Sequence, residues 1–268
     1  MAGRFRAFSF VDRIEAHAPG APVRGRYTVP AGASRFPASL AAEALGQLAA
    51  WAAMSAFDFR MRPVAGLAGG TRYCRPFGPG DTLELEVDME SATGSDVAYH
   101  GRASVGGEVA LVLEHALGPM LPSEEFDAPD ALRSDFATLT GPGAPPDRFA
   151  GVDAPAVAAE TIDEGSSLRG HLAIPAGAPF FTDHFPRKPV FPATLLMDAL
   201  GNAAARMAGD RHRVVGMQDV KVRVFMPPGA TLAVAVDVDR DDPLSARVVA
   251  KMDGRPAATA RVRLERDR

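Results

Sequence analysis

The residues best suited to acid–base chemistry lie in one stretch, Pro179 to Asn202, which reads PFFTDHFPRKPVFPATLLMDALGN. His184 lies in a loop rich in phenylalanine and proline, and the predicted helix that follows is apolar except for Asp198 and Asn202. A carboxylate on such a helix is costly to desolvate unless it is paired or protonated. An imidazole titrates near neutral pH, and a carboxyl group in an apolar site can keep its proton. The stretch therefore indicates general acid–base catalysis.

The same pattern occurs twice in the chain, which indicates a fused duplication of a whole domain. The echoed segments, in the same order in both halves, are RGRYTVPAG with RGHLAIPAG (24–32 and 169–177), FPASLAAEALGQ with FPATLLMDALGN (36–47 and 191–202), and PGDTLELEVD with PGATLAVAVD (79–88 and 228–237). Their spacing grows from 145 residues for the first pair to 155 for the second, so the first copy lacks ten residues between Ala33 and Phe36. The missing residues are those that hold His184 in the second copy. The first copy keeps an acid, Glu43, at the position of Asp198.

Two long helices are expected to position these groups. Residues 39–54 and 194–207 are apolar nearly all round, which is typical of a fully buried helix. Pro37 and Pro192 lie just before them, where the start of a helix tolerates proline. We therefore expect each helix to lie at the centre of one unit.

Alternating strands follow each helix. Leu83, Leu85 and Val87 alternate with acidic residues, and Val262 and Leu264 alternate with charged residues near the end of the chain. A period of two with one polar face predicts antiparallel strands that pack on one side. A sheet wrapped around one buried helix satisfies both patterns, so the predicted class is α+β. Two such units side by side could pair their edge strands.

The segment 121–146 is rich in proline, aspartate and glycine and shows no sustained strand alternation. We interpret it as an interdomain linker in which 130–136 form a short helix. The predicted organisation is a first domain at 1–120 without the histidine loop, the linker at 121–146, and a second domain at 147–268 that carries the loop.

The pattern H-F-P-x-x-P-V-x-P, with an acid on a helix fourteen residues after the histidine, resembles the β-hydroxyacyl-acyl carrier protein dehydratases. These are hot-dog-fold enzymes of fatty acid and polyketide synthesis. The resemblance implies a double hot-dog, in which two antiparallel sheets each wrap around a central buried helix and pair as a pseudo-dimer. The chain departs from the family pattern in its missing first loop and in its helix starts, which are Pro-Ala at Ala38 and Ala193 instead of Pro-Gly.

The resemblance also implies a reaction, the dehydration of (3R)-hydroxyacyl thioesters to trans-2-enoyl thioesters. His184 would take a proton from Cα, and a carboxyl group would protonate the departing hydroxyl. A backbone N–H at the helix start, Ala193 after Pro192, would face the thioester oxygen. Phe185 would support the histidine loop.

The partner acid of His184 can be chosen by carrying over the family's topology. In the family's homodimers, the histidine of one subunit faces the acid on the other subunit's central helix. His184 should then face Glu43, with Gln47 one turn further on the same helix face. Asp198 is the possible second acid, and we expect it in the mirror-image site that lacks the loop.

The expected partner is an acyl carrier protein, whose phosphopantetheine arm would enter between the two units; no cofactor is expected. A basic rim would attract the acidic carrier. Arg187 and Lys188 are the candidates for it, together with Arg211, Arg213, Lys221 and Arg223. An ordinary solvated face explains these residues equally well. A homodimer or association with synthase components is also compatible with the sequence.

Composition narrows the remaining classes. The chain has 268 residues and a formal net charge of −4, and it contains no basic run, which argues against nucleic-acid binding. A single cysteine, Cys74, excludes a disulfide framework, and no metal site is expected. The sequence has no apolar stretch approaching twenty residues and no apolar signal-peptide core, so we expect no membrane span and a cytoplasmic location.

Three functions remain open. The first is a 3-hydroxyacyl-acyl carrier protein dehydratase. The second is a hot-dog thioesterase that uses Glu43 or Asp198 to activate water, since the fold supports both chemistries. The third is a non-catalytic partner of another dehydratase or synthase component, suggested by the shortened first copy. Acyl chain length and pathway do not follow from the sequence.

Overall fold

The computed structural model describes residues 5, 7–145, 152, 154–209 and 211–266. The first half of the chain forms β1 (Arg13–Ala16), β2 (Val23–Thr28), α1 (Ser39–Ala56), β3 (Met61–Pro63), β4 (Leu67–Tyr73), β5 (Thr82–Ala92), β6 (Asp96–Val105) and β7 (Glu108–Pro122). A connecting segment then forms η1 (Ser123–Glu125) and α2 (Pro129–Thr140). The second half forms β8 (Ala158–Asp163), β9 (Ser167–Ala173), η2 (Pro179–Thr182), α3 (Ala193–Ala208), β10 (His212–Val222), β11 (Thr231–Asp239), β12 (Asp242–Met252) and β13 (Arg255–Arg266).

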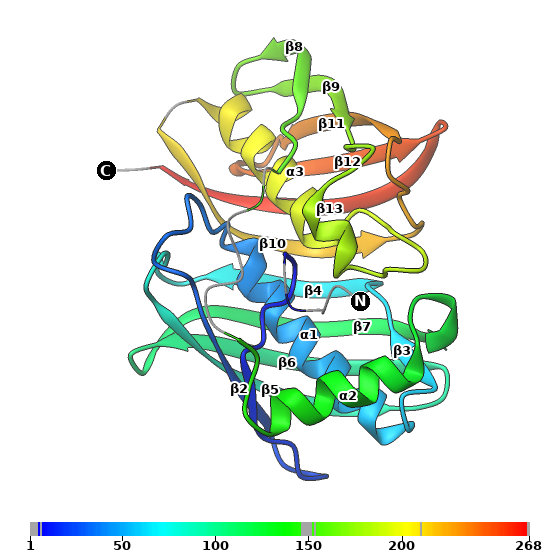
Figure 1. The fold of residues 1–268 in the computed structure, drawn as a ribbon. Coiled ribbons are helices and arrows are strands. Elements are labelled where there is room, and N and C mark those ends of the chain that lie inside the picture. The colour runs from blue at the N-terminus through cyan, green and yellow to red at the C-terminus, as the bar shows by residue number, and fades with distance from the viewer. Residues whose placement is uncertain (1–4, 6, 146–151, 153, 210, 267–268) are drawn as a thin grey trace.

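The strands form one antiparallel, 13-stranded sheet in the order β1-β2-β5-β6-β7-β4-β10-β13-β12-β11-β9-β8, with β3 paired to β7 (Figure 1). The two halves join where β4 pairs with β10, in a register that places Thr71 opposite Met217. A Cβ on Gly216 would lie 2.5 Å from the carbonyl oxygen of Thr71, so glycine allows the close approach at this join. The expected pairing of two hot-dog sheets edge to edge is thus observed.

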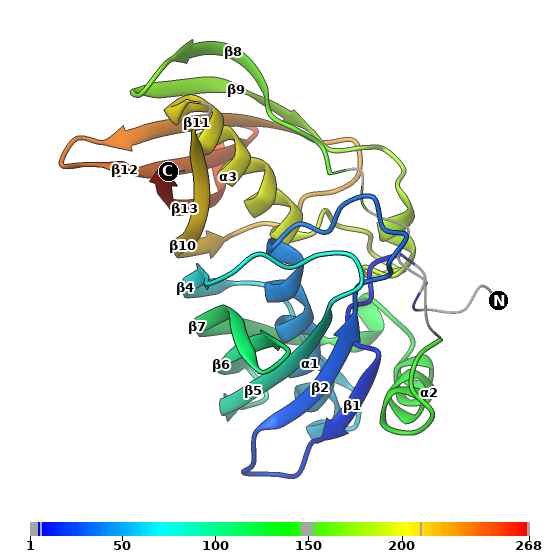
Figure 2. The same ribbon diagram turned by 90° about the vertical axis from the view of Figure 1, so that its left-hand side faces the viewer.

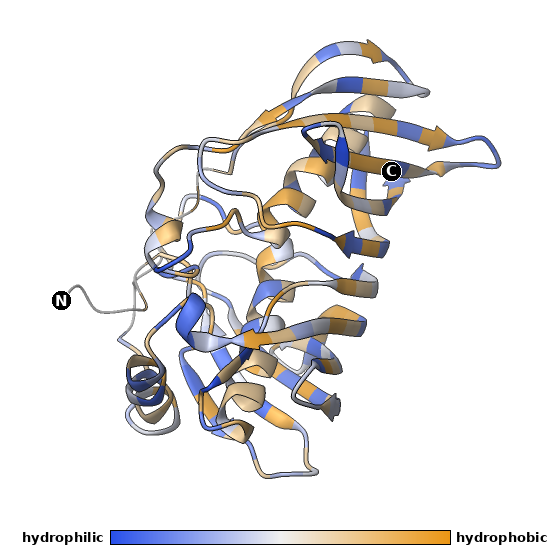
Figure 3. Ribbon diagram, turned by 90° about the vertical axis from the view of Figure 1, so that its right-hand side faces the viewer, coloured by the Kyte–Doolittle hydropathy of each residue, from blue (hydrophilic) through white to orange (hydrophobic). Residues whose placement is uncertain are grey.

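The helices α1 and α3 lie on the concave side of the sheet, one in each half, as Figure 2 shows. Leu40, Leu45 and Leu48 of α1 and Leu195 and Leu200 of α3 are completely buried. The strands alternate as expected, and Figure 3 shows the alternation as bands of opposite hydropathy along them. The expected architecture, a sheet wrapped around a buried helix in each half, is confirmed.

The segment predicted to be a linker is mostly regular structure. β7 extends to Pro122, and α2 is longer than the expected short helix. Leu132 and Leu139 of α2 are completely buried, and the Arg133 guanidinium donates to the Asp58 carboxylate from Nε and from Nη2, each at 3.1 Å. The α2 helix therefore packs against the first half of the molecule. The predicted boundary between residues 146 and 147 lies outside the described residues.

Within the described part of the chain, no helix is both long enough and apolar enough to span a membrane.

Candidate active site

A short loop between η2 and α3 carries His184. The backbone N–H of His184 donates to the carbonyl of Phe180 at 3.0 Å, and the next residue, Phe185, has a φ of 61°. Non-glycine residues rarely adopt this left-handed conformation, so packing must hold it. Phe185 is buried, 5.0 Å from the ring of Phe126, with the guanidinium of Arg62 4.2 Å from its ring centre. Phe185 thus anchors the histidine loop, in the supporting position expected of it.

The imidazole of His184 is held as a neutral base. Its Nδ1 donates to the carbonyl oxygen of Val190 at 3.0 Å, which leaves Nε2 as the acceptor nitrogen. Burial lowers the pKa of His184 from 6.5 to about 4, while the hydrogen bond to Val190 raises it and the charge of Arg62 lowers it further. At neutral pH the ring is therefore uncharged and able to accept a proton at Nε2.

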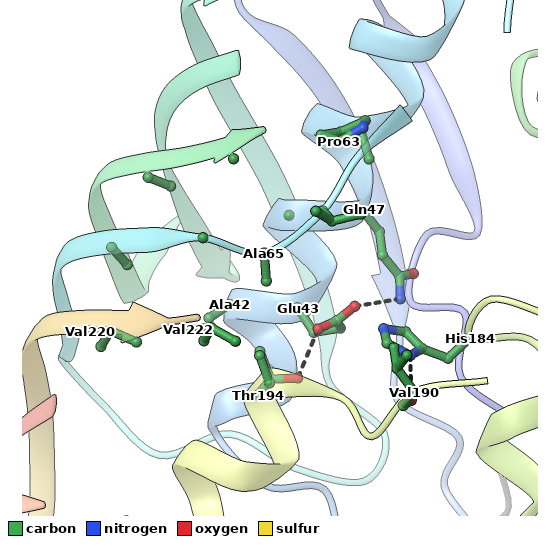
Figure 4. A pocket seen from close by; sticks show the side chains of 18 of the residues that line it. Ala42, Glu43, Gln47, Pro63, Ala65, His184, Val190, Thr194, Val220 and Val222 are labelled. Atoms are coloured by element: carbon green, nitrogen blue, oxygen red, sulfur yellow. Dashed lines mark hydrogen bonds between the residues drawn. The ribbon is translucent and has the colours of Figure 1, made fainter. Parts of the chain in front are cut away.

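The carboxyl group of Glu43 lies beside this ring (Figure 4). Gln47 Nε2 donates to Glu43 Oε1 at 3.0 Å, and Thr194 Oγ1 donates to Glu43 Oε2 at 2.7 Å. Burial raises the pKa of Glu43, and these two hydrogen bonds lower it to a smaller extent. Thr194 belongs to α3, so the acid of the first copy is held by a hydroxyl of the second. A carboxyl group with a raised pKa is suited to proton donation.

A segment near the N-terminus, residues 7–10, connects the loop that carries His184 with the helix that carries Glu43. Asp183 Oδ2 accepts hydrogen bonds from the backbone N–H of Ala7 at 2.7 Å and of Phe8 at 3.0 Å. At the other end, Gln47 accepts from the N–H of Phe10 at 2.8 Å and donates to the carbonyl of Phe8 at 3.1 Å. Asp183 precedes His184 in the chain, and Gln47 lies one turn after Glu43. The segment therefore ties the histidine loop to α1.

Phe8 adds a direct contact with the base. Its ring lies edge-on to the imidazole of His184, with ring centres 5.3 Å apart, and it also packs against Phe10 at 4.9 Å. Phe8 is 2% exposed, so its ring is fixed by packing. The position of His184 thus depends on residues from both copies and from the N-terminal segment.

The start of α3 closes the site on one side. Pro192 is the N-cap of this helix, and Ala193 is its first residue and lines the cavity. The first N–H groups of a helix have no partner within it, so they can bind a developing oxyanion. In the first copy α1 begins at Ser39, one residue later than the position equivalent to Ala193.

His184 and Glu43 share a cavity of about 450 Å³. Apart from His184, Glu43, Gln47 and a few other polar groups, its walls are largely apolar and come from α1, β4, β6, β7 and β10. Figure 4 shows Ala42, Val220 and Val222 around Glu43. A long apolar cavity with a few converging polar groups is typical of a site for a ligand with an apolar chain.

Asp198 lies in a second, separate cavity of about 330 Å³. Its Oδ2 accepts from Arg35 Nη2 at 2.9 Å and from Asn202 Nδ2 at 3.1 Å. Burial raises the pKa of Asp198, whereas Arg35 and Asn202 lower it. The two acids therefore face different cavities, and His184 shares its cavity with Glu43, not with Asp198.

The two predicted rim residues already have partners within the chain. Arg187 Nη1 donates to the carbonyls of Glu124 at 3.0 Å and Asp127 at 3.2 Å, and Lys188 Nζ lies 3.3 Å from Glu125 Oε2. Both side chains thus brace the histidine loop against the segment after β7. Of the additional candidates, Arg223 lines the cavity. A role for Arg187 and Lys188 in carrier binding remains a prediction.

Several residues of the site did not emerge from the sequence. Thr194 was not singled out, although the repeat aligns it with Ser39 and so places a hydroxyl there in both copies. Arg62, Asp183 and residues 7–10 carry no motif, and only tertiary contacts bring them to the site. The described residues contain no group of three or more histidine, cysteine or acidic side chains arranged to hold a metal ion.

The sheet wrapped around two central helices defines the molecule as a double hot-dog protein. The 12:0-ACP thioesterase from Umbellularia californica has the same overall fold, with a TM-score of 0.58, 11% identity, and coverage of 93% of this chain and 99% of that one. At this identity the likeness concerns the fold alone.

Sequence comparison identifies the family. Residues 160–260 match the ApeI-like family, described as ApeI dehydratase. The 3-hydroxyacyl-(acyl-carrier-protein) dehydratase FabZ of Clostridium botulinum is 30% identical over 108 residues, which are 37% of this chain and 75% of that enzyme. The FabZ of Albidiferax ferrireducens is 34% identical over 89 residues, 30% of this chain and only 59% of its own length. The chain belongs to the hot-dog dehydratase family that contains these enzymes.

Proposed function

We propose that this protein dehydrates (3R)-3-hydroxyacyl thioesters, carried by an acyl carrier protein, to trans-2-enoyl thioesters. One observation carries the proposal. A neutral histidine and a carboxyl group with a raised pKa, from different copies of the duplicated domain, meet in one largely apolar cavity. This pairing supplies a neutral base and a carboxyl group whose raised pKa favours its protonated form, and the proposed reaction uses no cofactor.

The proposed reaction moves two protons. His184 Nε2 takes a proton from Cα of the bound thioester, and that electron pair forms the Cα–Cβ double bond. The β-hydroxyl leaves with the proton of Glu43 as water. The proton on His184 then passes to the Glu43 carboxylate and restores the starting state. During the reaction, backbone N–H groups at the start of α3 stabilise the negative charge on the thioester oxygen.

Resemblance to the family and the largely apolar cavity support delivery of the substrate by a carrier protein. Acyl groups in this family are presented on a phosphopantetheine arm, which needs a cavity that opens to the surface. Arg223 lines the cavity and carries a positive charge toward an acidic carrier or the phosphate of the arm. Association with a synthase component is compatible with such delivery, and fatty acid and polyketide pathways both use it.

The proposal is tested by incubating the protein with a 3-hydroxyacyl-pantetheine thioester. Dehydration produces enoyl absorbance, whereas thioester hydrolysis releases a free thiol that a thiol reagent detects. We expect enoyl product without thiol release, and no product from the His184→Ala variant. Thiol release without enoyl product would identify a thioesterase. The absence of both, with substrates from short to long and with a loaded carrier protein, would favour a non-catalytic partner.

A further inference from the structure

The cavity runs along one face of α1. Its lining includes Glu43, Gly46, Gln47, Ala50 and Met54, which recur every three or four residues and so share one side of the helix. A helix rises about 1.5 Å per residue, so the distance along the axis from Glu43 to Met54 is roughly 16 Å, enough for an extended chain of roughly ten carbons. Beyond Gln47, the residues of α1 that line the cavity are all apolar.

The two ends of the cavity differ in exposure. On β4, on β7 and just after the end of β10, the lining residues Leu67, Leu117 and Val224 are 44%, 41% and 38% exposed. At the other end, Met54 is 2% exposed and Val97 and Leu132 are completely buried. The part of the cavity beneath the last turns of α1 is therefore its buried end.

The buried end is lined in part by α2, which belongs to neither copy of the duplicated domain. Phe136 of α2 packs against Trp51 and Phe59, with ring centres 6.3 Å and 5.4 Å apart. The hydrogen bonds from Arg133 to Asp58 hold the same part of α2 against the end of α1. Leu132 lies one turn before Phe136 and lines the cavity.

We propose that Leu132 of α2 is the end wall of the acyl channel and sets the longest acyl chain that this protein accepts. The inference rests on the proposed function, because it takes the ligand's apolar chain to be the acyl group. With the thioester between His184 and Glu43, a chain that points toward the buried end lies along Gly46, Ala50 and Trp51 and meets Leu132. The segment between the two copies is then a specificity element as well as a connection.

A binding measurement tests this without requiring turnover. Trp51 is the single tryptophan of the chain and lines the closed part of the cavity, so its fluorescence reports a ligand there. Saturated acyl-pantetheine thioesters of increasing length are titrated against the full-length protein. Each additional buried methylene should raise affinity about fourfold, until the chain meets the wall and the gain stops.

Variants of Leu132 and Leu139 distinguish an effect on chain length from an effect on the stability of the protein. Leu132→Ala should move the break to chains about two to three carbons longer, and Leu132→Phe should move it to shorter chains. Leu139→Ala is the matched control, because Leu139 is equally buried on the same helix and does not line the cavity. It should lower the melting temperature without moving the break. An unchanged break in both Leu132 variants, with the proteins folded, would overturn the inference.

The same ligand series with a 3-hydroxyl group distinguishes this inference from the proposed function. If the break in binding moves with Leu132 while no enoyl product forms, the channel assignment stands and the dehydratase proposal fails. If enoyl product forms and the preferred chain length does not change in the Leu132 variants, the dehydratase proposal stands and the channel assignment fails.

Discussion

The two halves of the molecule carry the same helix motif, yet only the acid of the first copy, Glu43, shares its cavity with the loop histidine His184. In the first cavity, Thr194 donates a hydrogen bond to Glu43, and His184 lies beside the acid. In the second, Asp198 pairs with Arg35 instead. The hydroxyl of Ser39, which corresponds to Thr194, is buried without a hydrogen-bond partner among the described residues.

The difference shows how the loss of the histidine loop changes the second cavity. Without the histidine loop, Asp198 has no counterpart of His184, and the partly exposed Arg35 pairs with it. His212 also lines this cavity, with its Nδ1 hydrogen-bonded to the carbonyl of Gly209 at 3.2 Å. Arg35 lies just before α1, in the short connection that replaces the loop. The first cavity needs His184 from the second copy and Glu43 from the first, so one loop is sufficient for one complete site.

Replacing His184 should have the largest effect. His184→Ala removes the proposed base, and we expect turnover of a 3-hydroxyacyl thioester to fall by about 10²-fold or more. The residue lies in a loop, so the melting temperature should change little. Enoyl formation at the normal rate by a folded His184→Ala protein would end the dehydratase proposal.

The two acids provide a matched pair. Glu43→Gln keeps the shape and the hydrogen bonds but removes the proton donor, so turnover should fall by about 10²-fold. Asp198→Asn should leave turnover nearly unchanged, because it alters the other cavity. Steady-state kinetics and thermal unfolding of both variants are the measurements.

The opposite ranking, with Asp198→Asn inactive and Glu43→Gln active, would place the working acid in the same copy as His184. Equal losses that follow the melting temperatures would assign both acids to packing.

Releasing the N-terminal segment, residues 7–10, should have a smaller effect on turnover, because this segment only positions His184. Asp183→Ala removes the acceptor for the N–H groups of Ala7 and Phe8, and we expect kcat to fall by roughly tenfold with little change in KM. Because Asp183 and Phe8 act through the same segment, their alanine variants should be non-additive in a double-mutant cycle. Additive losses of kcat, or a rise in KM with kcat unchanged, would contradict a positioning role.

Removing the two equivalent hydroxyls, those of Thr194 and Ser39, should have different effects on turnover. Thr194→Ala removes a hydrogen bond to Glu43, and turnover should fall by roughly three- to tenfold while the pKa of Glu43 rises further. Ser39→Ala removes a buried hydroxyl that has no partner, so stability should stay equal or increase by up to about 1 kcal/mol. Comparison of kcat and denaturant midpoints for the two variants tests the asymmetry directly.

The smallest expected effect is a shift in the pH profile of kcat/KM when Arg62 is replaced. The proposed dehydration requires neutral His184 and protonated Glu43, so kcat/KM should fall on the acidic side through the lowered pKa of His184, about 4, instead of 6.5. On the alkaline side it should fall through the raised pKa of Glu43. Arg62→Gln removes a positive charge near His184, so the acidic limb should move to higher pH by up to about one unit. An acidic limb that stays in place would show that Arg62 does not act on His184.

The same pKa shifts affect stability. The pKa of His184 is lower in the folded protein, so the unfolded chain binds the extra proton and stability falls as the pH drops from 6.5 towards 4. The pKa of Glu43 is higher in the folded protein, so its contribution is lost as the pH rises above 4.5.

Local pattern in the sequence determined much of this protein. The apolar composition of residues 39–54 and 194–207 predicted both buried helices, and the period of two predicted the strands, because burial of one face of a strand imposes that period. The repeat predicted the duplication and the missing loop. The histidine motif, through family topology, predicted that His184 would face Glu43 across the two copies, and the structure places both in one cavity.

Tertiary structure decided what no period encodes. Asp183 and Gln47 meet at residues 7–10 from positions that are far apart in the chain, and their hydrogen bonds depend on the docking of one copy against the other. The raised pKa of Glu43 and the lowered pKa of His184 arise from burial, which residue types alone do not specify. The segment 121–146 has the composition of a linker, yet Leu132 and Leu139 are completely buried in the folded protein. Its helix therefore lines a cavity because of where the chain docks, and composition carries no signal for that.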